Sequence, residues 1–421
     1  MTDFYDALET RSPTEREAAL MAALPLRVAH AQAHSAAMGE VLAGVDARQV
    51  IDRTALARLP VIRKGELHQR QKTGRAAGRD AFGGFAAVGY GASMPRVFAS
   101  PGPIYEPEGT ARDYWRMARA IHAAGFRSGE LIHNCFSYHF VPAGSMMESG
   151  AHALGCTVFP GGTGQTEQQV EAMAELRPAG YIGTPSFLKI IVEKAAAMGQ
   201  LLPSVTKAMV GGEACTPNLR DWFTERGIDA YQCFATADLG LIAYETSARE
   251  GLVLDEGVIV EIVRPGTGDS VADGEVGELV ITTLNTDYPL IRFGTGDLSA
   301  VLPGRCPTGR SNTRIKGWMG RADQTVKIRG MFVHPAQVAD IARRFPEVLK
   351  ARLVVSGEMA SDAMTLQVEA AAADSDAQTV LSQRIGEAVR DITKLRGSVE
   401  LHRPGSLPND GKVIEDARSY K

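Results

Sequence analysis

Polar and apolar positions change their spacing several times along the chain, and each change predicts a different kind of element. Between residues 110 and 250, short apolar runs typical of strands alternate with segments of helical spacing. The pattern predicts a helix over 166–176, a strand over 180–184, a helix over 186–198 and a strand over 205–210. Alternation of this kind is typical of an α/β domain whose sheet is at least partly parallel.

The N-terminal region is predicted to be helical. Ser12 and Glu15 have the spacing of a capping box, and Pro13 suits the first position of a helix. The Ala-rich helical stretch that follows runs to about Leu42. Residues 75–110 are rich in glycine, proline and small residues, so this region predicts no long element.

After residue 250 the pattern favours strands and then a mixed module. Two β-branched runs, 258–263 and 277–283, predict an antiparallel β subdomain at about 250–320. Beyond it, two short strands turn at Gly330, and two amphipathic helices and three strands follow up to residue 402. We therefore expect a large N-terminal α/β domain over 1–322 and a small, mobile C-terminal α+β domain over 323–421.

Composition narrows the class of protein. The 421 residues include 45 Lys and Arg against 49 Asp and Glu, a net charge of −4, which gives no electrostatic case for nucleic acid or an anionic membrane. No apolar run is long enough to span a bilayer, and the acidic N-terminus does not resemble a signal peptide. Five scattered cysteines favour free thiols, so we expect a cytoplasmic protein.

Two segments could bind a nucleotide. Gly211, Gly212 and Glu213 close a predicted strand, where glycine lets a ligand approach the backbone. About 20 residues later, Phe234, Ala235, Thr236 and Asp238 offer a ring that could stack on a base, a hydroxyl for a phosphate and a carboxylate for Mg²⁺. The sequence leaves alternatives open: Phe234 as a core residue and Thr236 as a capping hydroxyl.

Two further residues lie on Gly-containing turns. Asp297 ends a Gly-Thr-Gly-Asp segment and could accept hydrogen bonds from a diol such as ribose, or bond its own backbone instead. Lys412 follows a Pro-Asn-Asp-Gly turn near the end of the chain. On its own such a lysine is ordinarily a solvated surface residue.

Taken in order, these segments resemble a known family. The strand with Gly-Gly-Glu, the Phe-Ala-Thr-Ala-Asp segment, residues 289–297, Gly-Arg-Ala-Asp at 320–323 and the C-terminal Gly-Lys are similar to the adenylate-forming acyl-CoA ligases. Residues 164–169, 183–187 and 284–297 resemble the phenylacetate–CoA ligase branch, and the likeness covers roughly residues 80–420. It implies an ATP-dependent carboxylate–CoA ligase that uses ATP, Mg²⁺, coenzyme A and a small carboxylic acid.

The resemblance also implies roles for individual residues. The adenine would be bound by Gly211, Gly212, Glu213 and Ala235, with Phe234 stacked on it, and the ribose by Asp297 and Arg321. At the phosphates, Thr236 and Lys412 would contact the α-phosphate and Asp238 would bind Mg²⁺. Asp323 would be the hinge between the domains. In the acyl pocket, Phe136, Tyr138, Phe140 and Gly183 would suit a flat ring, so an aryl or arylacetic acid is expected. The three aromatic residues could equally pack the core.

Three departures from the family pattern stand out. In the phosphate loop Ser100, Gly102 and Pro107 match, but Glu106 replaces a lysine. Asp238 occupies a position where the family pattern has a glutamate. Many relatives have a cysteine after the glutamate at position 245 and two cysteines in the later segment. Here Thr246 follows Glu245, and Cys306-Pro307-Thr308 has one cysteine. One thiol cannot form a tetrahedral zinc site, so we expect no structural zinc.

The altered loop keeps a second function open. The chain could be a homologue that binds a nucleotide or acyl-CoA with lost or weak ATP-dependent activation. The presence of Lys412, Asp297 and Asp323 favours the enzyme, since a protein that only binds would need neither the lysine nor a hinge. Neither a P-loop nor a nicotinamide-binding Gly motif follows a predicted strand, which excludes those classes. The sequence leaves the oligomeric state open, a homodimer included.

Overall fold

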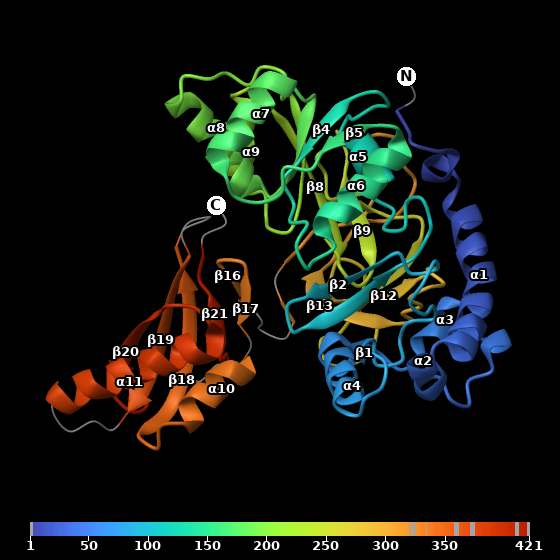
Figure 1. Cartoon of the computed structure of the whole chain (residues 1–421). Coiled ribbons are helices and arrows are strands. Elements are labelled where there is room, and N and C mark those ends of the chain that lie inside the picture. The colour runs from blue at the N-terminus through green and yellow to red at the C-terminus, as the bar shows by residue number, and fades with distance from the viewer. Residues whose placement is uncertain are drawn as a thin grey trace. The chain divides into compact units, whose positions relative to one another are not determined.

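A computed structural model describes residues 3–319, 321–322, 326–333, 335–357, 362–370, 375–408 and 412–418. The chain divides into two compact units, unit 1 over Met1–Met319 and unit 2 over Gly320–Lys421 (Figure 1). The predicted α/β class is confirmed, with a large N-terminal part and a small α+β C-terminal part. Asp323, where we expected the boundary, lies outside the described residues.

The larger sheet of unit 1 has nine strands in the order β14-β15-β10-β9-β8-β7-β6-β4-β5. They are β4 (Leu131–Asn134), β5 (Thr157–Phe159), β6 (Gly180–Gly183), β7 (Lys207–Val210), β8 (Asp229–Thr236), β9 (Gly240–Glu245), β10 (Leu252–Leu254), β14 (Val301–Leu302) and β15 (Arg314–Ile315). Strands β5, β4, β6, β7 and β8 are parallel, and β9 is antiparallel to β8.

Parallel strands need crossover connections, and helices supply most of them. These helices are α5 (Ala118–Ala123), which precedes β4, and α6 (Ala143–Leu154), α7 (Thr166–Leu176), α8 (Pro185–Ala197) and α9 (Pro217–Thr224). Helices α7, α8 and α9 gather at one end of unit 1 in Figure 1. The predicted helix over 166–176 has the observed bounds, and the alternation predicted for this region is confirmed.

A second sheet of unit 1 has the order β1-β13-β12-β11. Its strands are β1 (Ile62–Arg63), β11 (Val258–Val263), β12 (Gly277–Thr283) and β13 (Phe293–Ser299). Strands β11 and β12 are antiparallel, as predicted. Two strands that were not predicted complete the sheet: β13 is antiparallel to β12, and β1 adds to β13 in parallel. A separate hairpin pairs β2 (Arg96–Ser100) with β3 (Ile104–Glu108).

The N-terminal helices α1 (Pro13–His34), α2 (Ala36–Val41), η2 (Ala47–Gln49), α3 (Arg53–Ala57) and α4 (Lys64–Ala76) share a core with this second sheet. The core contains Val28 and Met38 from the helices and Ile259 and Phe293 from the sheet. A short helix, η1 (Ala7–Thr10), precedes α1. The capping box of Ser12 and Glu15 is present. The helix that we expected to run to Leu42 breaks at Ser35, whose side chain accepts from the Met38 amide and starts α2.

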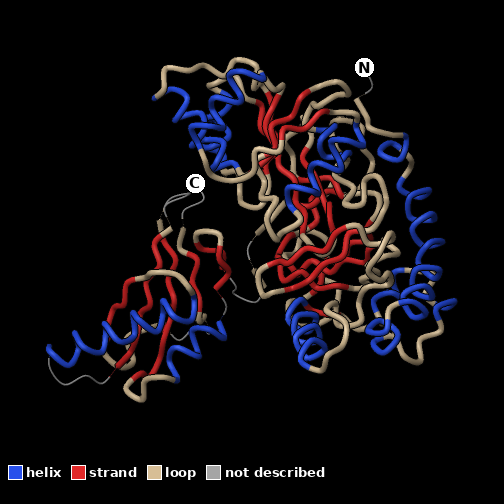
Figure 2. The backbone as a smooth tube through the Cα atoms, viewed as in Figure 1, coloured by secondary structure: helices blue, strands red, loops and turns tan. Residues whose placement is uncertain are grey.

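Unit 2 has a four-stranded sheet in the order β20-β19-β18-β21. Its strands are β18 (Val348–Ser356), β19 (Ala363–Ala370), β20 (Ser398–His402) and β21 (Ile414–Asp416), beside a hairpin of β16 (Val326–Ile328) and β17 (Met331–Val333). Helices α10 (Pro335–Arg343) and α11 (Ser375–Thr393) contact each other and the sheet (Figure 2). Val338, Leu353, Leu366 and Ile385 belong to their common core.

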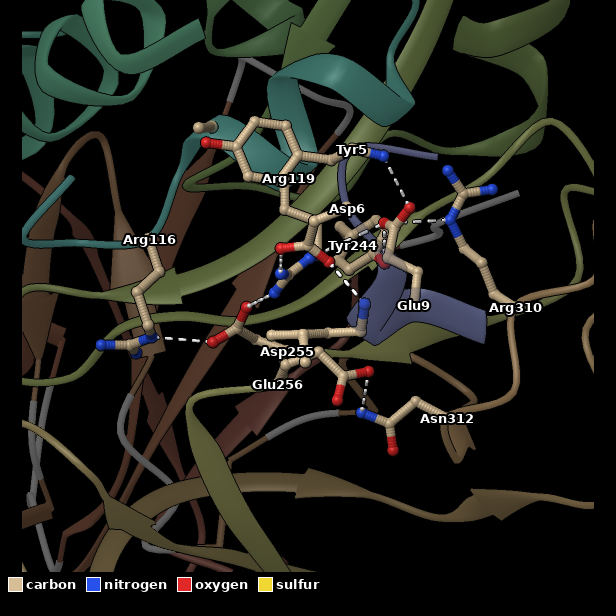
Figure 3. A network of polar contacts seen from close by, with 12 residues as sticks. Tyr5, Asp6, Glu9, Arg116, Arg119, Tyr244, Asp255, Glu256, Arg310 and Asn312 are labelled. Carbon is tan, nitrogen blue, oxygen red and sulfur yellow. Dashed lines mark hydrogen bonds and ion pairs between the residues drawn. The ribbon is translucent and has the colours of Figure 1, made fainter. Parts of the chain in front are cut away.

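A buried group of charged side chains ties the N-terminal residues to the larger sheet (Figure 3). We call it the N-terminal network; its members are the carboxylates Asp6, Glu9, Asp255 and Glu256 and the arginines Arg11, Arg16, Arg116, Arg119 and Arg310. Tyr244 also donates its hydroxyl proton to Glu9. Among the residues that the structure describes, no helix is both long and apolar enough to cross a membrane.

Candidate functional site

The predicted nucleotide-binding segments follow neighbouring parallel strands. Phe136 comes after β4, Thr184 after β6, Gly211 to Glu213 after β7, and Asp238 after β8. The carboxyl ends of parallel strands lie at one edge of the sheet, and in open α/β sheets ligands bind in the crevice outside this edge. The topology therefore gathers the predicted segments at the edge where a ligand is expected.

Contacts at this edge join the loops. The Ser186 amide donates to Glu213 Oε1 at 2.7 Å, which connects the loops after β6 and β7. A Cβ added to Gly211 would lie 3.0 Å from Cys233 Sγ, and one added to Gly212 would lie 3.6 Å from Phe136 Cε1. Gly212 also has a φ of +77°, which side-chain-bearing residues rarely adopt. A side chain at either glycine would therefore fill the space beside Phe136 or strain the loop.

The end of β8 carries three candidate residues. Phe234 is half-buried and packs against the core that includes the second sheet. Ala235 is half-buried beside it. Thr236 Oγ1 accepts from the Leu239 amide at 3.2 Å, which is the capping bond that the sequence left open. This bond fixes the turn that carries Asp238.

Asp297 lies in β13 and is buried. Its Oδ1 accepts from the indole Nε1 of Trp318 at 3.0 Å. Its amide donates to Thr295 Oγ1 at 3.1 Å, so the Gly-Thr-Gly-Asp segment is held by its own side chain. The carboxylate is thus oriented by Trp318, a contact that the sequence did not predict.

Helix α4 connects the segments of β8 and β13. The pairing of Arg63 with Gly294 sets the start of α4 beside the Gly-Thr-Gly-Asp segment. Lys64, the first residue of α4, donates from Nζ to Asp238 Oδ2 at 2.6 Å. No role was predicted for Lys64, because its partner lies 174 residues away in the chain and β1 has only two residues.

Glu106 lies in β3, opposite Phe98 of β2 and close to the turn of the hairpin. It is 0% exposed, and its Oε2 accepts from the Ser100 amide at 3.2 Å across the turn that contains Gly102. Burial, and next the negative charge of Asp238, raise the pKa of Glu106 to about 8. The residue that replaces the expected lysine is therefore turned inward, toward Asp238.

Two carboxylate oxygens near these residues are left over. Asp238 Oδ1 and Glu106 Oε1 are buried and have no hydrogen-bond partner within the described parts of the chain. Burial, and next the charges of Asp238 and Glu106, raise the pKa of Tyr288, while a hydrogen bond with the Gln71 side chain lowers it. We call Lys64, Glu106, Asp238 and Tyr288 the α4 cluster.

The aromatic residues after β4 differ in their exposure to solvent. Phe136 is buried against Gly212. The Tyr138 hydroxyl donates to Glu148 at 2.7 Å and accepts from Asn134 at 2.8 Å. Phe140 is 83% exposed and has a φ of +61°, a conformation that is unusual for a bulky residue.

Gly183, the fourth residue predicted for the acyl pocket, ends β6. A Cβ there would lie 2.1 Å from the Tyr181 hydroxyl, which itself donates to the Thr184 carbonyl. Only glycine fits this position unless Tyr181 moves. Gly183 and Phe136 thus lie on adjacent strands of the same sheet edge, while Phe140 lies in solvent.

The remaining predicted residues belong to unit 2. Lys412 is exposed and precedes β21 by two residues. Arg321 is half-buried, and Asp323 lies outside the described residues, as do the three residues before Lys412.

Cys306 is flanked by hydroxyl groups. Its thiol lies 3.4 Å from Thr246 Oγ1 and 3.0 Å from Thr308 Oγ1. Among the described residues, no group of three or more His, Cys, Asp and Glu side chains is arranged to hold a metal ion. The expected absence of structural zinc stays a prediction.

Comparison with known proteins gives concordant results. The sequence matches the family described as AMP-binding enzyme over residues 110–286, and its C-terminal domain over residues 330–417. A phenylacetate–coenzyme A ligase of Aromatoleum evansii is 32% identical over 331 residues, which is 75% of this chain and 72% of the relative. A phenylacetate–coenzyme A ligase of Thermus thermophilus is 31% identical over 375 residues, 84% of this chain and 81% of the relative.

A solved structure supports the fold. A 2-hydroxyisobutyryl-CoA ligase, in complex with 2-HIB-AMP and CoA, superimposes with a TM-score of 0.82 and covers 100% of this chain and 93% of its own. At 24% identity this likeness concerns the fold alone.

Proposed function

Because the chain belongs to the AMP-binding enzymes, and within them to the phenylacetate–coenzyme A ligase branch, we propose that it activates an aryl or arylacetic acid with ATP and transfers the acyl group to coenzyme A. One structural observation carries the proposal. The segments with Gly211, Gly212, Thr236 and Asp238 converge at the carboxyl edge of one parallel sheet, where such folds bind ligands. Five buried free cysteines suit a reducing compartment, which favours the cytoplasm.

The proposed reaction has two steps. The carboxylate oxygen of the acid attacks the α-phosphorus of ATP, which forms an acyl-adenylate and releases pyrophosphate. The thiol of coenzyme A then loses its proton and attacks the acyl carbonyl carbon, which forms the thioester and releases AMP. Since both reactants of the first step are anions, the protein must supply positive charge and hydrogen-bond donors at the phosphate.

We assign the residues of the proposed site by their order along the chain. In this assignment Gly211, Gly212, Glu213, Phe234 and Ala235 bind the adenine, Asp297 and Arg321 bind the ribose, Ser100 and Gly102 approach the phosphates, Thr236 and Lys412 act on the α-phosphate, and Asp323 is the hinge. The exposed position of Gly102 in the turn between β2 and β3 and the oriented carboxylate of Asp297 support it.

The residues around Asp238 fit a magnesium ion. Asp238 Oδ1 is a buried carboxylate oxygen without a hydrogen-bond partner in the described structure, which is the kind of ligand that Mg²⁺ prefers. A bound Mg²⁺ would neutralise charge on the phosphates of ATP. Lys64, which already contacts Asp238, would hold the carboxylate in place and add a second positive charge.

The walls of the acyl pocket support a flat substrate. Phe136 and Gly183 lie at the same sheet edge as the adenine segment, and Tyr138 is fixed by Glu148 and Asn134. Phe140 is exposed, so in this proposal it covers the acyl group only after a substrate enters.

Acid-dependent exchange of labelled pyrophosphate into ATP tests the function directly. We expect exchange with one or more of a panel of aromatic acids and less exchange with short aliphatic acids. Folded protein that exchanges with none of them, but binds AMP or acyl-CoA, would support the alternative of a binding homologue.

A second test concerns Lys412. Lys412→Ala is expected to lower acyl-adenylate formation by about 100-fold or more, as removal of an electrostatic stabiliser does. Thioester formation from supplied acyl-adenylate should change little, because the lysine acts on the phosphate. Equal loss of both half-reactions would contradict the assignment.

A further inference from the structure

The connection that carries Lys412 crosses one end of the sheet in unit 2. Strands β20 and β21 lie at the two edges of this sheet, with β19 and β18 between them (Figure 1). Because β20 is parallel to β19, β21 is parallel to β18, and β18 is antiparallel to β19, the chain leaves β20 and enters β21 at the same end. Three strand spacings amount to about 14 Å, so this connection has to pass the ends of β19 and β18.

Two side chains at this end of the sheet bond the backbone of the connection. Glu369 of β19 and Lys350 of β18 are register partners. The carboxylate of Glu369 accepts from the Gly405 amide at 2.9 Å and from the Leu407 amide at 2.7 Å. Lys350 Nζ donates to the Pro408 carbonyl at 2.7 Å and, less closely, to the Leu407 carbonyl at 3.5 Å. Hydrogen bonds to charged groups are stronger than those between neutral groups, so these contacts form an anchor.

The anchor is built into the fold. Glu369 is 5% exposed and Leu407 is 7% exposed. A carboxylate removed from water has to be compensated by hydrogen bonds, and here each of its oxygens accepts from one amide of the connection. The hydrogen bonds from Gly405 and Leu407 lower the pKa of Glu369, so its carboxylate is ionised at neutral pH.

The chain is held again directly after Lys412. The Leu353 amide donates to the Val413 carbonyl at 2.9 Å, and the buried Ile414 begins β21. Lys412 therefore follows the anchored Pro408 by four residues and precedes the anchored Val413 by one. A short stretch between two fixed points has fewer backbone conformations to search than a stretch fixed at one end.

We propose that Glu369 and Lys350 are positioning residues for Lys412, because they hold the backbone that brings its ammonium group to the α-phosphate. The inference rests on the proposed function, in which Lys412 acts on acyl-adenylate formation. Both residues act through Lys412 and not on the reactants. Orientation of a catalytic group lowers the entropy cost of reaction, and a misplacement of about 1 Å can cost about 100-fold in rate. Their loss should therefore slow acyl-adenylate formation and spare thioester formation.

Rates of the two half-reactions in the full-length protein test the inference. A glutamine side chain has one acceptor oxygen, so in Glu369→Gln one of the two backbone amides loses its partner. We expect the rate of acyl-adenylate formation at saturating ATP and acid to fall about 10- to 100-fold, with a change of less than about 3-fold in the KM for ATP. Thioester formation from supplied acyl-adenylate should stay within about 2-fold of wild type.

Lys350 provides a pair of variants for loss and rescue. Lys350→Met removes the donor to the Pro408 carbonyl and should lower the rate of acyl-adenylate formation about 10-fold. Lys350→Arg keeps a charged donor on a long side chain and should restore most of this rate. Equal rates for the two variants would overturn the role of Lys350.

Two controls separate positioning from stability. Glu400→Gln makes the same chemical change on the neighbouring strand β20, where Glu400 is exposed and bonds the Gln367 side chain, and should leave both half-reactions unchanged. Val368→Ala alters the buried residue next to Glu369, which belongs to the core of unit 2. It should lower the stability of unit 2 but neither half-reaction of the folded protein. A selective loss of acyl-adenylate formation in Val368→Ala as large as in Glu369→Gln would overturn the inference.

Hydrogen exchange measures the anchor without reference to activity. Mass spectrometry of peptides that cover residues 403–413 reports the amides of Gly405 and Leu407, which Glu369 protects. In Glu369→Gln these amides should exchange at least about 10-fold faster, while peptides from β18 exchange as slowly as in wild type. Unchanged exchange at residues 403–413 would overturn the inference. Fast exchange in β18 would show that unit 2 has unfolded, and Lys350→Met then decides the question.

The outcomes separate the inference from the proposed function. Wild-type protein without acid-dependent pyrophosphate exchange overturns the proposed function and, with it, the purpose of the anchor. An active wild type with a normal Glu369→Gln, or with both half-reactions lowered equally in that variant, overturns the inference alone. An active wild type in which the variants lose acyl-adenylate formation selectively supports both.

Discussion

Unit 1 buries two groups of charged side chains, and they are built in different ways. In the N-terminal network each of the four carboxylates contacts at least one arginine, and Asp255 contacts both Arg116 and Arg119 (Figure 3). In the α4 cluster Lys64 contacts Asp238, Glu106 accepts from the Ser100 amide, and each carboxyl group leaves one oxygen without a partner in the described structure. Buried charges are stable only when they are paired. In the N-terminal network every carboxylate has an arginine, whereas in the α4 cluster Asp238 has Lys64 and Glu106 has no ion-pair partner among the described residues.

The difference also separates structural from chemical roles. The N-terminal network joins η1, its N-cap residue Asp6 and α1 to α5, to the residues after β10 and to the segment between β14 and β15, so its loss should loosen the N-terminal segment. The α4 cluster lies beside the loops that we assign to ATP. Variants of the network are therefore expected to change stability, and variants of the cluster to change binding and catalysis.

Arg119→Met should have the largest effect on stability. Arg119 contacts Asp6 and Asp255, and its removal leaves Asp6 without its arginine and the buried Asp255 with Arg116 alone, which should cost about 3–4 kcal/mol of unfolding free energy. Urea unfolding followed by tryptophan fluorescence measures it, since all three tryptophans lie in unit 1. The control is Arg48→Met: Arg48 is 88% exposed and pairs with Asp46, and because water screens such a pair its loss should leave the unfolding free energy almost unchanged. Similar losses for the two variants would contradict the structural role.

A pair of glutamate-to-glutamine substitutions compares the regions with matched chemistry. Glu256→Gln removes the charge that Arg11 and Arg16 contact and should lower the unfolding free energy by about 3 kcal/mol. Glu106→Gln should change it by about 1 kcal/mol or less at pH 7, because Glu106 has a pKa of about 8 and is already protonated there. The same urea titrations measure both, and a larger loss for Glu106→Gln would reverse the comparison.

His122 gives a smaller, pH-dependent effect next to the N-terminal network. Burial, and next the charges of Arg127 and Arg310, lower the pKa of His122 to about 4. Between pH 6.5 and 4 the unfolded chain therefore binds a proton that the folded protein does not, so stability falls as the pH is lowered through this range. His122→Gln should flatten this part of the profile of melting temperature against pH. An unchanged profile would show that His122 is not the group responsible.

Much of the fold could be predicted because its elements are long and regular. The helix over 166–176 and the strands near residues 260 and 280 have clear periodicity. The β2–β3 hairpin and β1 could not be predicted, because they are short and β3 contains a proline. The break at Ser35 depends on a single capping side chain within an otherwise continuous helical pattern.

The candidate site was predictable only where it is local in sequence. The motifs at the carboxyl ends of the strands could be predicted, because Gly211 follows β7, Thr236 ends β8 and Asp238 comes two residues later. Lys64 was missed because its contact with Asp238 depends on the pairing of β1 with β13. The inward direction of Glu106 depends on the register of the hairpin and on α4, whose Gln71 bonds the backbone of Tyr105.

Two aspartate-to-asparagine variants test the central claim, which is that the α4 cluster takes part in the chemistry at the phosphates and the N-terminal network stabilises the fold. The measurement is the single-turnover rate of acyl-adenylate formation by folded protein, with the acid that exchanges fastest. Asp238→Asn should lower this rate about 10- to 100-fold without loss of stability. Asp255→Asn should keep the rate of the folded fraction while stability falls. A normal rate for Asp238→Asn, or a loss confined to Asp255→Asn, would contradict the account.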